Sequence, residues 1–346
     1  MIKRLQSLLA LDVVNAPRTV SRSRRRVFLK LRRFVWLLPF LTLYVPVIAY
    51  YLTSPTIDAN VRASVQNTTL SPNPEIFAWH VVWISSGILS AAVWVLAWLV
   101  SWKYIRQNVD LASLSTRCVL LMALLWSLAT VLVLRGFFGA LGYPPYSLAF
   151  AVQGALDENR SLIPSEHTLL VSAITYSGPM IIFGFSAGIH VAYCSCSCLL
   201  PLGRRSMKCD FQHGSILAER MRQLQVALSI GAGVTAVGLL RQFALARMIV
   251  SVFPESSAIR IASDASLLYL GIYYTVTLAC VYVPAASILR DRALRIASAL
   301  SLERRNQWID DTGFGDLHFG WLHRLLLILS PLATGIASIT LGGILN

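Results

Sequence analysis

The stretch FAWHVVWISSGILSAAVWVLAWLVS, residues 77–101, decides the class of fold, because its 25 residues include no aspartate, glutamate, lysine or arginine. A helix rises about 1.5 Å per residue, so about 20 apolar residues cross the ~30 Å hydrocarbon core of a bilayer. Lipid offers no partner for exposed backbone N–H and C=O groups, whereas a helix satisfies its own. The stretch therefore predicts a transmembrane helix.

Stretches of the same length and apolar character recur on both sides of this one. We predict seven spans, at about 34–53, 77–101, 118–141, 168–191, 224–247, 266–289 and 321–344. The weak alternation of apolar and polar residues that marks membrane β-barrel strands is absent. The sequence therefore predicts an all-α fold, a polytopic transmembrane helical bundle that occupies residues 34–346.

The composition agrees with a membrane protein. The chain is 56% hydrophobic and 13% charged, with a mean hydropathy of +0.63, whereas about 25% of the residues in soluble domains are charged. In a soluble protein the formal net charge of +14 would suggest nucleic acid. Here the basic residues lie mainly in the connections between apolar stretches, so we predict no nucleic-acid partner.

Basic residues gather in every second connection, which indicates how the chain is oriented. Of the 30 lysines and arginines, 24 fall on one side of the predicted membrane and only three in the intervening connections. The basic side comprises residues 1–33, 102–117, 200–223 and 290–320, with Arg324 at the edge of the last span. Cytoplasmic loops carry the excess of lysine and arginine. We therefore predict a cytoplasmic N-terminus and, after seven crossings, an extracytoplasmic C-terminus.

Residues 1–33 form a separate basic, amphipathic segment on the cytoplasmic side. The sequence MIKRLQSLLALDVV places Ile2, Leu5, Leu8 and Leu9 on one helical face before the sequence NAP ends the pattern. A dense basic run follows, and such segments bind anionic lipids at the membrane surface. The positive region is too long for a cleavable signal peptide. We predict an interfacial segment that contacts anionic lipids, with a regulatory lipid sensor as the alternative.

A cluster of cysteines, in HVAYCSCSCLLPLGRRSMKC (190–209), falls at the predicted cytoplasmic end of the fourth span. Because the cytoplasm is reducing, a structural disulfide is disfavoured. The spacing does not match the paired ligands of zinc sites, so we predict no metal. Cys194, Cys196 and Cys198 beside a basic segment are candidates for S-palmitoylation, whereas close packing of small residues between helices is the simpler interpretation.

Five polar residues fall near the outer boundary of the predicted bundle. Ionisable groups within a membrane are costly and are therefore candidates for function. They are Arg135, Arg241, His80, Glu166 and His167. Together they could form an outer-face pocket for a small anionic or lipid ligand, because a guanidinium group binds oxyanions in bidentate geometry. In the structural alternative the arginines extend to the interface and Glu166 caps the fourth span.

The sequence PSEHT, residues 164–168, resembles the PSGH motif of the phosphatidic acid phosphatase type 2 superfamily. In that family the histidine lies near the lipid surface and serves as a general acid, so the resemblance implies that role for His167. It covers five residues only. Glu166 replaces the glycine, and the further motifs that supply the family's nucleophilic histidine are absent. We therefore do not assign the chain to this family.

No sequence motif identifies an enzymatic reaction. Nucleotide-binding loops, the strict GxGxxG dinucleotide fingerprint, and zinc-protease and kinase motifs do not occur, and we predict no cofactor. The favoured interpretation is a non-enzymatic membrane component, for transport, channel-like conduction, sensing or scaffolding. The alternative is a lipid-binding or lipid-modifying enzyme with a polar site at the outer face. We expect the plasma membrane or a bacterial inner membrane, and the oligomeric state stays open.

Overall fold

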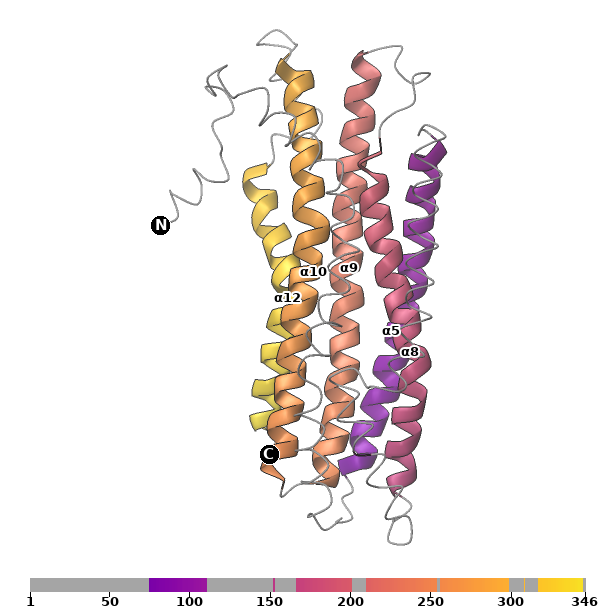
Figure 1. Cartoon of the computed structure of the whole chain (residues 1–346), viewed down its shortest axis with the longest axis vertical. Coiled ribbons are helices and arrows are strands. Elements are labelled where there is room, and N and C mark those ends of the chain that lie inside the picture. The colour runs from indigo at the N-terminus through magenta and orange to yellow at the C-terminus, as the bar shows by residue number, and fades with distance from the viewer. Residues whose placement is uncertain are drawn as a thin grey trace, which may run out of the picture. The chain divides into compact units, whose positions relative to one another are not determined.

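Five long helices form the part of the chain that the computed structural model describes, namely residues 75–110, 152, 166–200, 210–253, 256–298, 308 and 317–344. The helices are α5 (Glu75–Asp110), α8 (Glu166–Ser197), α9 (Asp210–Val252), α10 (Ser257–Ser298) and α12 (Leu317–Ile344), as Figure 1 shows. No strand occurs among these residues, so the predicted all-α class is confirmed for them. The segment 1–33 and the predicted spans 34–53 and 118–141 lie outside the described residues.

Three of the helices are long and apolar enough to cross a membrane. Their candidate spans are Glu75–Val109, Ser215–Val252 and Ser257–Ala293, and they contain the predicted spans 77–101, 224–247 and 266–289. Shorter apolar stretches occur in α8 and α12, at Thr168–Ser177 and Arg324–Thr340. These helices indicate a membrane protein.

Large apolar side chains on the outside of the bundle agree with a membrane environment. On α5, Ile88 is 69% exposed and Leu99 is 66% exposed, and on α10 Ile261 is 69% exposed. Extended apolar surface of this kind is uncommon on soluble monomers and is typical of surfaces that contact lipid or another protein.

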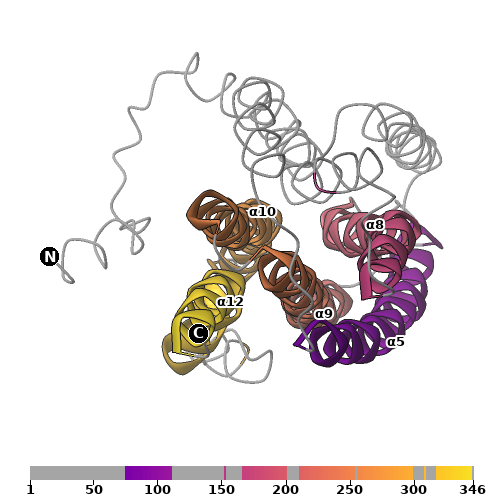
Figure 2. The same cartoon turned by 90° about the horizontal axis from the view of Figure 1, so that it is seen from below.

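Helix α9 lies at the centre of the described bundle and packs against α5, α8, α10 and α12. The end-on view in Figure 2 shows α9 between α5 and α8 on one side and α10 and α12 on the other.

A glycine allows α10 and α12 to approach each other closely. A Cβ atom added to Gly271 of α10 would lie 3.0 Å from the carbonyl oxygen of Pro331 in α12, so only a residue without a side chain fits there.

The directions of the helices follow from the residues that meet at their ends. Trp79 of α5 packs on Phe243 near the end of α9, and Asn108 of α5 bonds to Gln223 near its start. These two helices are therefore antiparallel. Asn108 also bonds to Ser197 at the end of α8, whereas the starts of α5 and α8 meet in one hydrophobic cluster, so α5 and α8 are parallel.

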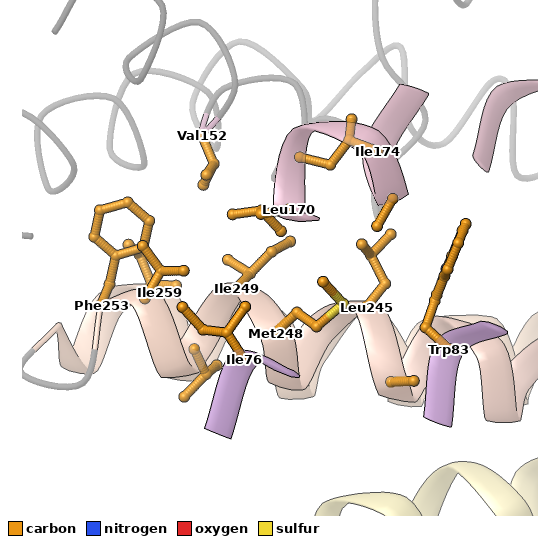
Figure 3. Close-up of a cluster of buried hydrophobic side chains, with 14 residues drawn as sticks. Ile76, Trp83, Val152, Leu170, Ile174, Leu245, Met248, Ile249, Phe253 and Ile259 are labelled. Atoms are coloured by element: carbon orange, nitrogen blue, oxygen red, sulfur yellow. The ribbon is translucent and has the colours of Figure 1, made fainter. Parts of the chain in front are cut away.

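The two largest hydrophobic clusters of the described bundle lie near its opposite ends. The first joins the starts of α5, α8 and α10 to the end of α9, and Figure 3 shows its side chains interdigitating. Its largest fully buried members are Leu170, Ile174, Leu245, Met248, Ile249, Phe253 and Ile259. The second joins the end of α8 and the start of α9 to α10 and α12, around Leu224, Leu228 and Leu289.

Prolines lie inside three of the described helices without ending them. Pro179 lies within α8, Pro284 within α10 and Pro331 within α12. A proline removes one helical hydrogen bond and disturbs its neighbours, which another helix can satisfy in a membrane. The backbone N–H of Leu332, directly after Pro331, donates to the Thr275 hydroxyl of α10 at 3.2 Å. This bond joins α12, directly after its proline, to α10.

Candidate functional site

A cavity of about 110 Å³ lies between α5, α8, α9 and α10, roughly halfway along the helices and between the two hydrophobic clusters. Its described lining is mostly apolar and includes Gly188 of α8 and Gly238 of α9. A Cβ atom added to either glycine would meet no other atom within 4 Å. The space therefore exists partly because these two positions carry no side chain.

Arg241 provides the positive charge in the wall of this cavity. The residue is only 3% exposed, and its guanidinium carbon lies 5.8 Å from the centre of the Trp94 ring. Side chains of an α-helix tilt toward its N-terminus, so Arg241 extends from the later part of α9 toward the middle of the bundle. Its guanidinium group consequently lies beside Trp94, near the middle of α5, and not at the end of the helices.

Three polar atoms of lining residues are buried and make no hydrogen bond of normal geometry among the described residues. They are the indole Nε1 of Trp94 and the hydroxyls of Tyr273 and Thr277, two hydroxyls that lie near each other. A buried polar atom that makes no hydrogen bond costs about 1–3 kcal/mol, and native proteins contain few such atoms. Four groups able to donate a hydrogen bond, from α5, α9 and α10, therefore belong to one cavity wall.

Two residues of the predicted outer-face pocket, Arg241 and His80, have described side chains, and these do not lie together. His80 stacks on Trp83 at 5.9 Å and does not line the cavity. It precedes Trp94 by 14 residues on α5, about 21 Å at the rise of a helix. Glu166 and His167 begin α8, and only their backbone is described. Arg135 lies outside the described residues.

An ion pair near the end of α9 was not predicted from the sequence. Nη2 of Arg247 lies 3.3 Å from Oδ1 of Asp264 on α10. The arginine side chain is 5% exposed and also lies over the Phe243 ring, whereas the aspartate is 30% exposed. The signal in the sequence is an arginine in the fifth predicted span and an aspartate just before the sixth, on either side of a short connection.

The cysteines of the sequence cluster are buried at the end of α8. Cys194, Cys196 and Cys198 are each at most 3% exposed. Burial raises the pKa of the Cys196 thiol to about 12. The thiolate is the reactive form of cysteine, and S-palmitoylation of these residues stays a prediction. Within the described ranges, no group of three or more His, Cys, Asp or Glu side chains could hold a metal ion.

A polar network surrounds these cysteines. The amide nitrogen of Asn108, which is 2% exposed, donates to the Ser197 hydroxyl at 3.0 Å and to Gln223 Oε1 at 2.8 Å. The network thereby joins α5, α8 and α9. Sequence reasoning missed it because neutral amides at the end of an apolar stretch carry no distinctive pattern.

Two arginines donate hydrogen bonds to backbone carbonyl groups just after the end of α8. Arg220 of α9 donates to the carbonyl oxygen of Leu200, and Nη2 of Arg292 donates to that of Leu199 at 2.8 Å. Cations are stabilising at the C-terminal end of a helix, where the unpaired carbonyl groups carry partial negative charge. These two residues therefore close the end of α8 and join it to α9 and α10.

No family model, curated protein or solved structure matches this chain significantly. The class of protein is therefore defined by the fold and the cavity alone. The described part is a helical bundle with candidate membrane spans and a mostly apolar internal cavity that contains a buried arginine.

Proposed function

We propose that this chain is a seven-span protein of the plasma membrane or a bacterial inner membrane that acts as a non-enzymatic component and holds a small ligand between α5, α8, α9 and α10. The observation that carries the proposal is the cavity, whose mostly apolar lining includes a buried arginine and three residues with buried hydrogen-bond donors. Binding pockets typically combine an apolar wall with a few convergent polar groups. A transporter, sensor or scaffold could each use such a site.

The directions of the helices support seven spans. Helices α5 and α8 follow one another among the described elements and are parallel. The chain between them must therefore return along the length of the bundle, as the third span at 118–141 would do. The excess of basic residues in alternate connections supports a cytoplasmic N-terminus.

The alternative is a lipid-modifying enzyme with its site at the outer face. Its support is His80, whose buried Nδ1 has no hydrogen-bond partner in the described part of the chain. A general acid or base must lie within hydrogen-bond reach of the reacting group. His80 lies about 21 Å from Trp94 by the rise of α5, so this alternative requires a second site apart from the cavity.

The topology can be tested with single cysteine or epitope tags at the two termini of the protein in intact cells. We expect the N-terminal tag to be protected from an impermeant reagent and the C-terminal tag to react with it, because seven crossings place the ends on opposite sides. A tag at 142–146, after the third proposed span, should also react. Protection of both termini, or reaction of both, would exclude seven spans.

The ligand site can be tested by thermal unfolding of the purified protein in nanodiscs of neutral lipid. We expect at least one of a set of neutral, anionic and cationic single-chain amphiphiles to raise the unfolding temperature, since a ligand at 100 times its Kd stabilises by about 2.7 kcal/mol. The cavity-filling variant Gly188→Ala/Gly238→Ala should lose this response. It should unfold at the wild-type temperature or above, because alanine favours a helix over glycine by about 0.5–1 kcal/mol per residue.

The matched control is Gly87→Ala/Gly233→Ala. Neither glycine lines the cavity, and added Cβ atoms would have ordinary contacts at 3.8 Å with Met180 and Val93. This variant should keep the ligand response of the wild type. A response that survives filling of the cavity would place the ligand elsewhere, and no response to any amphiphile would remove the basis of the proposal.

A further inference from the structure

We infer that the ligand of the cavity is an oxyanion, a carboxylate or a phosphate, carried at the end of a single apolar chain. This inference rests on the proposed function, and it names the chemical class of the ligand that the cavity would bind. It uses three features of the cavity: the kind of polar groups in its wall, the apolar remainder of the wall, and the volume.

The polar groups favour a ligand that accepts hydrogen bonds and is negatively charged. Arginine and the tryptophan indole only donate hydrogen bonds, and hydroxyl groups are able to donate. Arg241, Trp94, Tyr273 and Thr277 are therefore able to donate. The described lining contains no aspartate or glutamate, and its other polar side chains are uncharged: Thr235, Gln242 and Tyr274. A guanidinium group matches the geometry of carboxylate and phosphate oxygens better than any other side chain.

The remainder of the wall favours an apolar chain on that head group. Met180, Leu270 and Val281 belong to the lining, and each offers only apolar contact. A free inorganic anion would have to lose its hydration against such a wall, which is costly without full hydrogen bonding. An amphiphile loses only the hydration of its head group, and its chain gains apolar contacts.

The volume limits the ligand to one chain and places most of that chain outside the cavity. An apolar cavity of about 150 Å³ accommodates benzene, and this cavity measures about 110 Å³. It holds a head group with the first few carbons of a chain. The rest of the chain would extend between the helices toward lipid, as the candidate membrane spans allow.

The decisive experiment compares ligands of equal chain length in nanodiscs of neutral lipid. Thermal unfolding is measured with dodecyl phosphate, dodecanoate, dodecanol and dodecylammonium, and with inorganic phosphate and acetate. We expect only dodecyl phosphate and dodecanoate to raise the unfolding temperature. An equal response to dodecanol or dodecylammonium would overturn the anionic head group, although the proposed function would survive. An equal response to inorganic phosphate or acetate would overturn the apolar chain.

Variants of the donors connect this response to the cavity. Tyr273→Phe and Thr277→Val each remove one of two buried hydroxyls that lie near each other and make no hydrogen bond of normal geometry among the described residues, so the ligand-free variants should unfold near the wild-type temperature. Each should weaken binding of dodecyl phosphate about 3- to 10-fold, and Arg241→Gln about 10- to 100-fold, because hydrogen bonds involving charged groups are stronger. Unchanged affinity in Tyr273→Phe and Thr277→Val together would overturn the inference.

Tyr282→Phe is the matched control for Tyr273→Phe. The Tyr282 hydroxyl is also buried on α10 without a partner in the described chain, but Tyr282 does not line the cavity. The substitution therefore removes the same atom from the same helix outside the proposed site. We expect Tyr282→Phe to bind dodecyl phosphate with the wild-type affinity, and an equal loss of affinity in both variants would refute a direct contact with Tyr273.

Discussion

Asp264→Asn should lower the free energy of unfolding by about 2–3 kcal/mol, the largest effect that we expect from a charge-neutralising substitution. Asp264 is the partner of Arg247, whose side chain is 5% exposed. Removal of one member of a buried pair costs about 3–5 kcal/mol because the other charge stays buried without compensation. We expect a loss at or just below the lower end of this range, because Asp264 itself is 30% exposed and water can hydrate the arginine once the carboxylate is gone.

The measurement is reversible unfolding of the protein in mild detergent, followed by circular dichroism. The double variant Arg247→Met/Asp264→Leu separates the loss of an ion pair from general damage to the packing. It should be more stable than Asp264→Asn, because replacing both charges with apolar side chains is often neutral. Arg260→Gln, at an exposed position of α10, serves as a control and should change stability by less than about 0.5 kcal/mol. Equal stability of Asp264→Asn and the wild type would show that Arg247 does not depend on this pair.

Asn108→Ala should also lower the free energy of unfolding by about 2–3 kcal/mol, through loss of a hydrogen-bond network. The substitution removes the bonds to Ser197 at 3.0 Å and to Gln223 at 2.8 Å. Each buried hydrogen bond contributes about 0.5–1.5 kcal/mol, and groups left without partners add a further cost. Because Asn108 joins α5 to α8 and α9, we also expect faster hydrogen exchange at the adjoining ends of these helices.

Hydrogen exchange separates this local effect from uniform destabilisation. Protection in the first turns of α5, near Ile76, should change much less than protection around Cys194 to Ser197. Arg106→Gln at an exposed neighbouring position is the control and should leave both the unfolding energy and the exchange pattern close to wild type. A uniform loss of protection throughout the helices would argue against a specific role of the Asn108 network.

Much of the fold could be predicted because its signal is local. A long uncharged run such as 77–101 has few alternatives to a helix in a membrane, whichever side chains it meets. The predicted spans 224–247 and 266–289 accordingly lie within candidate spans of the structure. The helices are longer than the predicted spans, because α9 begins at Asp210 and α10 continues to Ser298. Hydropathy detects only the apolar part of a helix, whereas the backbone hydrogen bonds continue into polar turns.

Less of the candidate site could be predicted from the sequence. Arg241 was identified because an arginine within an apolar run is conspicuous, but its position along the chain suggested the outer boundary. The structure shows its guanidinium group beside Trp94 instead. Tyr273 and Thr277 were missed, because a tyrosine and a threonine in an apolar helix give no signal until neighbouring helices bury their hydroxyls without partners.

The helical and apolar character of the described chain can be predicted from the sequence, because helix formation in lipid depends on the length and polarity of each segment. Which polar groups meet depends on the packing of separate helices. The approach of Arg241 to Trp94, the pairing of Arg247 with Asp264 and the cavity beside Gly188 and Gly238 all depend on how separate helices rotate and pack against one another. Such contacts join residues far apart in the chain, so no local pattern specifies them.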